Sequence, residues 1–219
     1  MKRLINNILG FFITILTPIF IILTMLRLML TPLFLDVEYN MPAFPPDPYG
    51  FTKQERLHWS KIALNYLIND QGIAYLGDLK FEDGNPVYNQ RELKHMVDVK
   101  QVVQKALVAW YILLGLFLLI AILAWKTNNM AFFRSYLAKG GLLTIIFIAF
   151  ILVFVLVGFG IFFVAFHNLF FEPGTWTFLW SDTLIRLFPE RFWKDTFMII
   201  GGLSIFAGWG LWVWGKKLN

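Results

Sequence analysis

The stretch ALVAWYILLGLFLLIAILAW, residues 106–125, decides what kind of protein this is. It carries no charge, and about 20 apolar residues in a helix cross the hydrocarbon core of a bilayer. Three further stretches share this character, at about residues 4–34, 142–166 and 197–214. The composition agrees, because 58% of the residues are hydrophobic and only 15% are charged, whereas soluble domains are about 25% charged. We therefore predict an all-α membrane protein with four transmembrane helices.

The first apolar stretch follows Lys2 and Arg3, as a signal peptide would. It is too long for one and no small-residue cleavage site follows, so we expect a retained anchor. Pro18 should kink this helix and Pro32 should end it. The predicted boundaries are 1–34, 105–126, 141–166 and 196–215 for the helices, 35–104 for a small extracytoplasmic domain, 127–140 for a cytoplasmic loop and 167–195 for an extracytoplasmic interfacial loop.

Charges are separated along the chain in a way that predicts its orientation. All 14 acidic residues lie within 36–98 or 172–195. Three other segments hold only basic charges: Lys2, Arg3, Lys126, Arg134, Lys139, Lys216 and Lys217. Because short basic segments stay in the cytoplasm, we predict a multi-pass protein of the cell membrane with both termini cytoplasmic and both acidic segments facing outward.

The first outer segment reads as a small helical domain. Thr52 and Glu55 form a capping box that predicts a helix after them. The run 79–88 contains the turn sequence DGNP and suits a short hairpin. Asn89 and Glu92 then predict the start of another helix, which meets no breaker and should continue into the second span. The second outer segment is rich in aromatic residues, so we expect it to lie in the membrane interface.

Three histidines, all in the outer segments, are the main candidates for chemistry: His58, His95 and His167. Glu92 and Asp98 flank His95 at spacings of three, on one side of a helix. A carboxylate beside an imidazole can fix its tautomer, and one His with two carboxylates can ligate zinc. The same spacing also occurs on a simple solvated helix face, so the residues alone leave these readings open.

The remaining candidates carry weaker signals. His167 lies among aromatics, which suits an interfacial residue as well as a functional one, while His58 lies mid-helix and favours a structural role. Ser181 lacks the Gly-x-Ser-x-Gly elbow that exposes a nucleophile. The chain has no Cys, no phosphate-binding loop and no dinucleotide fingerprint. The cytoplasmic bias of Lys and Arg explains the net charge without a nucleic acid partner.

Two stretches resemble a known family. One is YNQRELKHMVDVK, residues 88–100, and the other runs from FHNLFF at 166–171 through TLIRLFPERFW at 183–193. They are similar to the lipoprotein intramolecular transacylases of Gram-positive bacteria. Length, four spans and an outer domain agree as well, so the resemblance covers nearly the whole chain.

The resemblance implies that the substrate is a diacylated lipoprotein anchored in the phospholipid bilayer. The sn-2 acyl chain would move to the α-amino group of the lipoprotein's own N-terminal cysteine. His95 and His167 would be the acid–base pair, converging among polar groups in an apolar cleft, with Asn168, Arg186 or a backbone amide as oxyanion donors. We expect no metal and no cofactor. Two alternatives remain: a non-catalytic membrane module that binds a lipid or a partner, and a Ser- or metal-dependent lipid hydrolase.

Overall fold

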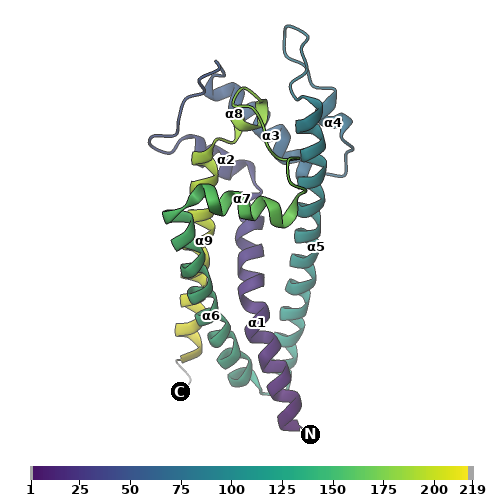
Figure 1. Ribbon diagram of the computed structural model, residues 1–219. Helices are drawn as coiled ribbons and strands as arrows, with labels where there is room; N and C mark the ends of the chain where they lie inside the picture. Colours follow the sequence, from purple (N-terminus) through teal and green to yellow (C-terminus); the bar gives the residue numbers. More distant parts are fainter. Residues whose placement is uncertain (1, 217–219) are drawn as a thin grey trace. The chain divides into compact units, whose positions relative to one another are not determined.

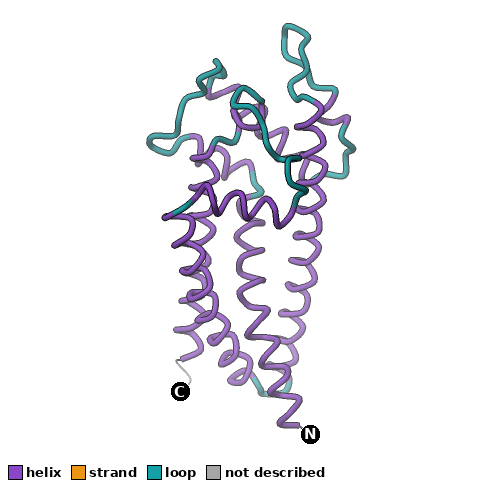
Figure 2. Tube along the Cα trace, in the orientation of Figure 1, coloured by secondary structure: helices purple, strands orange, loops and turns teal. Residues whose placement is uncertain are grey.

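The structure is a computed structural model that describes residues 2–216. Within this range the secondary structure is helical and forms no strand, with one isolated antiparallel bridge between Lys80 and Pro86 (Figure 2). The helices, labelled in Figure 1, are α1 (Lys2–Met29), α2 (Pro32–Tyr39), α3 (Lys53–Ile68), α4 (Ala74–Gly77), α5 (Gln90–Lys126), α6 (Met130–Val157), α7 (Phe159–Phe170), α8 (Thr183–Leu187) and α9 (Glu190–Lys216). Lys217, which contributes to the charge pattern, lies outside the described residues.

Four helices are long and apolar enough to cross a membrane: α1, α5, α6 and α9. The predicted all-α fold with four spans is therefore confirmed. As predicted, α5 runs without interruption from the outer segment into its apolar part, and Pro32 follows the end of α1. Pro18 lies inside α1, which stays helical on both sides of it.

The third span differs from the prediction. The sequence suggested one helix to residue 166, but α6 ends at Val157 and α7 begins at Phe159. Gly158 separates them with φ −148° and ψ 58°, outside the helical region. Glycine is the residue that most readily leaves helical geometry. A hydropathy profile does not show the break at Gly158, because the residues on both sides of it are equally apolar. The start of the third span also differs from the prediction, because α6 already begins at Met130, within the segment 127–140 that was expected to be a loop.

The chain divides into two compact units. The first contains α1 up to Arg27, α5 from Leu107, α6, and α9 from Phe197. Its centre is a cluster of buried apolar side chains that includes Ile13, Phe117 and Leu137. Gly141 and Gly208 let α6 and α9 touch, because a Cβ on Gly141 would lie 2.4 Å from the Gly208 carbonyl oxygen. Small residues at such contacts are typical of helix packing in membranes.

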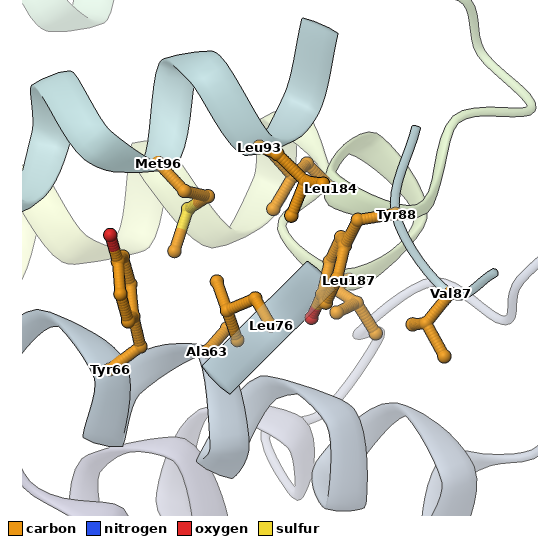
Figure 3. Packing of buried hydrophobic residues seen from close by; sticks show 9 residues of the cluster. All are labelled: Ala63, Tyr66, Leu76, Val87, Tyr88, Leu93, Met96, Leu184 and Leu187. Atoms are coloured by element: carbon orange, nitrogen blue, oxygen red, sulfur yellow. The ribbon is translucent and has the colours of Figure 1, made fainter. Parts of the chain in front are cut away.

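The second unit consists of Leu28–Ala106 and Gly158–Thr196. Its core combines side chains from α3, α4, α5, α8 and the loop before α5 (Figure 3): Ala63, Tyr66, Leu76, Val87, Tyr88, Leu93, Met96, Leu184 and Leu187. Both predicted capping boxes are present, since Thr52 pairs with Glu55 and Asn89 exchanges hydrogen bonds with Glu92. The core therefore holds the short helix α8 against the start of α5.

Candidate active site

His95 lies in the polar first part of α5, in the second unit, before the apolar segment that starts near Ala106. Only 8% of its surface is exposed. Its ring meets two aromatic rings edge-on, with centroid distances of 4.9 Å to Phe171 and 5.3 Å to Phe178. Its Nδ1 atom is buried and has no hydrogen-bond partner within the described residues. His95 is thus a polar group enclosed by aromatic carbon.

His167 lies in the last turn of α7 and is likewise 8% exposed. Its Nδ1 is 2.8 Å from the carbonyl oxygen of Phe163, one turn earlier. A carbonyl oxygen only accepts hydrogen bonds, so Nδ1 carries the proton and Nε2 keeps its lone pair. Rings of Phe163 and Trp176 lie 4.0 Å and 4.7 Å from the imidazole, centroid to centroid. The backbone of α7 thereby sets the tautomer of this histidine.

The two imidazoles face each other, although they are far apart in the sequence. Their ring centroids are 6.4 Å apart and their planes are 22° from parallel. The predicted convergence is confirmed, but the expected polar surroundings are not: the neighbours are the aromatic side chains of Phe163, Phe171, Phe178 and Trp176. Sequence reasoning missed these four as site residues. The aromatic richness of segment 167–195 was the signal that could have found three of them, whereas Phe163 lies in the predicted third span.

Burial sets the charge state of the pair. It lowers the pKa of His95 from 6.5 to about 4, with a smaller contribution from the nearby His167. Burial also lowers the pKa of His167, against an opposing effect of the Phe163 carbonyl, which favours the protonated ring. Desolvation disfavours the charged form of a histidine. Both rings are therefore neutral near pH 7 and able to accept a proton.

Glu92 does not act on His95 as the spacing suggested. It is 1% exposed, and its two oxygens accept hydrogen bonds from backbone N–H groups, from Asn89 at 2.8 Å and from Leu184 at 2.7 Å. It caps α5 and ties α8 to it. Asp98 is partly exposed and makes no hydrogen bond to His95 in the described part of the chain. Glu92, His95 and Asp98 also do not gather into a group that could hold a metal ion.

The expected oxyanion donors are placed elsewhere. Arg186 pairs with the buried carboxylate of Asp47 at 2.8 Å and stacks 3.4 Å from the Phe51 ring centroid, so its guanidinium is engaged. Asn168, one residue after His167, has an exposed side chain. His58 and Ser181 are exposed as well, and His58 meets the ring of its neighbour Trp59 edge-on. None of these side chains contacts the histidine pair in the described structure.

The fold and the site define a helical multi-pass membrane protein with a buried histidine pair. The model of the Lit family, described as lipoprotein intramolecular transacylase, matches residues 11–193. The chain belongs to this Lit family and is a membrane transacylase.

Individual relatives agree with this assignment. An uncharacterized protein of Aquifex aeolicus (strain VF5) is 31% identical over 189 residues, which is 83% of this chain and 81% of the relative. The structure of the lipoprotein intramolecular transacylase Lit from Bacillus cereus has the same fold, with a TM-score of 0.63 and 22% identity over 99% of this chain and 96% of that one. A variant of that protein with one histidine replaced by alanine gives a TM-score of 0.65 at 22% identity, over 100% and 97% of the two chains.

Proposed function

We propose that this protein moves the sn-2 acyl chain of a diacylglyceryl lipoprotein to the α-amino group of the lipoprotein's own N-terminal cysteine. The product is a lyso-form lipoprotein with an N-acyl amide. The observation that supports this most directly is the facing pair of His95 and His167, 6.4 Å apart in an aromatic surround, in a chain of the Lit family. Asn168 and Arg186 do not take part in this proposal.

The reaction needs one proton to move from nitrogen to oxygen. The amine nitrogen attacks the ester carbonyl carbon, the C–O bond to glycerol breaks, and the glycerol oxygen leaves with a proton. A positioned histidine is suited to such transfers. We assign the base to His167, because its Nδ1–H is held by the Phe163 carbonyl and its Nε2 lone pair is free. The proton that His167 takes from the amine then passes by way of His95, the other member of the pair, to the leaving glycerol oxygen.

The tethering of amine and ester in one substrate explains why a small site suffices. Holding two reacting groups in attack geometry is worth roughly 7–11 kcal/mol. The rings around the pair supply an apolar surface for an acyl ester and keep water away, which disfavours hydrolysis in place of transfer. No nucleophile from the protein is required, and Ser181 is exposed and makes no hydrogen bond to a histidine within the described residues.

We also propose that the histidine pair faces outward and that both termini are cytoplasmic. The separation of acidic segments from basic ones supports this orientation. It places the second unit on the side of the membrane where mature lipoproteins are anchored.

The direct test is mass spectrometry of a lipoprotein N-terminal peptide from cells with and without this protein. Cells that contain it should yield a peptide with one acyl chain on the α-amine and one on glycerol, with the same total mass as the diacylglyceryl form. Fragmentation locates the chain on nitrogen. Release of free fatty acid with loss of one acyl mass would instead identify a hydrolase, and an unchanged peptide would favour a binding module.

A further inference from the structure

The segment between α7 and α8 folds back on the histidine pair. Glu172, Pro173, Gly174 and Thr175 form a turn in which the Thr175 N–H donates to the Glu172 carbonyl at 3.2 Å. Gly174 has φ +86°, the value that a type II turn requires at its third residue. The chain therefore reverses, and the next residue, Trp176, brings its ring to 4.7 Å from that of His167.

The other end of this segment is fixed as well. Asp182 accepts hydrogen bonds from Asn89 at 3.0 Å and from Arg91 at 2.6 Å, both at the start of the chain region that carries His95. It also accepts the Leu179 N–H at 2.8 Å. Anchors at both ends hold Trp176 in place, although its indole nitrogen has no hydrogen-bond partner in the described part of the chain.

The indole nitrogen of Trp176 is the unusual atom of the site. Nε1 is buried and has no hydrogen-bond partner within the described residues. Leaving a buried N–H unpaired destabilises a folded protein, and such groups are rare enough to need a reason. His95 Nδ1 is a second unpaired atom in the same aromatic surround. The site therefore keeps hydrogen-bonding capacity that the protein itself does not use.

We propose that the Trp176 indole N–H donates a hydrogen bond to the carbonyl oxygen of the substrate ester. This inference rests on the proposed function. When the amine attacks, the carbonyl π electrons move to that oxygen, which becomes negatively charged in the tetrahedral intermediate. A donor fixed at this oxygen stabilises the developing charge. Indole only donates, so Trp176 keeps its proton while the histidines carry the proton from nitrogen to oxygen.

Two observations favour Trp176 over the donors suggested by the sequence. Arg186 is bound to Asp47, and the side chain of Asn168 is exposed. Trp176, in contrast, has a buried indole nitrogen and a ring that lies beside His167. Its N–H donates to the oxygen of the same ester carbonyl whose carbon the amine attacks.

The first test replaces Trp176 by Phe, which keeps an aromatic ring and removes the N–H. With a diacylglyceryl lipopeptide in detergent, kcat should fall by about 10²–10³-fold, the usual effect of losing an oxyanion donor, while KM and the thermal unfolding midpoint stay near those of the wild type. Trp180→Phe is the matched control, because Trp180 is 72% exposed in the same segment, and it should keep wild-type kcat. A Trp176→Phe enzyme with wild-type kcat, or with a change in KM alone, overturns the proposal.

The second test observes the hydrogen bond in the wild-type protein and needs the variant only to assign one resonance. Protein labelled with ¹⁵N on the indole nitrogens is titrated with a diacylglyceryl lipopeptide whose α-amine is acetylated and cannot react. The resonance missing from the Trp176→Phe spectrum identifies Trp176, and its N–H should shift downfield when the ester carbonyl binds. A resonance that does not move at saturation rejects the hydrogen bond.

The two tests separate this inference from the proposed function. If the wild type does not convert the lipopeptide, the transacylase proposal fails and the donor role fails with it. If the wild type converts it and Trp176→Phe does so equally well, only the donor role is lost.

Discussion

His95 and His167 share a residue type and an exposure of 8%, yet their hydrogen bonding differs. His167 donates its Nδ1–H to the Phe163 carbonyl, so its basic nitrogen is defined before any substrate arrives. Within the described residues the Nδ1 of His95 is unpaired, and its ring packs against those of Phe171 and Phe178. Two chemically identical side chains thus differ in hydrogen bonding because their neighbours differ.

We predict that His95→Ala and His167→Ala each reduce kcat by at least about 100-fold, the low end of acid–base contributions. Conversion of a diacylglyceryl lipopeptide, followed by mass spectrometry, measures the effect. His58→Ala is the control, because His58 is exposed on α3 and should retain wild-type turnover. Normal activity of either of the first two variants would remove that histidine from the mechanism.

The lowered pKa of His95 also predicts a pH dependence of stability. The pKa is about 4 in the folded protein and 6.5 for a free histidine, so between these values the unfolded chain binds the extra proton. The free energy of unfolding should therefore fall as the pH drops from 6.5 towards 4, by at most about 1.4 kcal/mol per pH unit from this group.

Unfolding in detergent between pH 7 and pH 5 tests this. His95→Gln should lose less stability over that range than the wild type, whereas His58→Gln, in which an exposed ring is replaced, should follow the wild type. Parallel curves for His95→Gln and the wild type would show that the buried ring does not titrate in this window.

At the scale of the elements, the start of α5 organises the second unit. Asn89 caps the helix, and Glu92 accepts the N–H of Asn89, just before α5, and that of Leu184 in α8. Thr183 at the start of α8 donates to the Val87 carbonyl at 2.6 Å. A buried carboxylate with two N–H donors is a strong, charge-assisted contact. It explains why segment 167–195 is fixed against the helix that carries His95.

We predict that Glu92→Gln destabilises the protein by about 1–3 kcal/mol, because the amide NH₂ cannot accept a hydrogen bond and leaves one buried N–H unpaired. Chemical denaturation in detergent measures the change. Glu190→Gln provides the comparison: Glu190 pairs with Lys194 on the exposed side of α9, and losing such a pair costs about 0.2–0.5 kcal/mol. Equal effects of the two substitutions would mean that Glu92 is no more than a surface carboxylate.

At the scale of the whole molecule, the proposed orientation can be tested with single cysteines, because the natural chain has none. Thr127 is exposed in the short connection between α5 and α6, and it is preferable to its neighbour Asn128, whose φ is +56°. In intact cells Thr127→Cys should resist an impermeant thiol reagent and Glu82→Cys should react. The reverse labelling would invert the topology, and permeabilised cells should label both. Asn219 at the C-terminus lies outside the described residues.

What the sequence determined by itself is local or additive. Each span follows from the summed transfer free energy of consecutive side chains, and each helix start follows from capping residues a few positions apart, as at Thr52 and Asn89. The three histidines could be named as candidates because residue type, too, is read directly from the sequence. Only the tertiary structure decided which rings enclose them, that Glu92 binds Leu184 and not His95, and that Trp176 lies beside His167. Those contacts join residues from different segments, and they depend on tertiary packing, which no local pattern of hydropathy or spacing encodes.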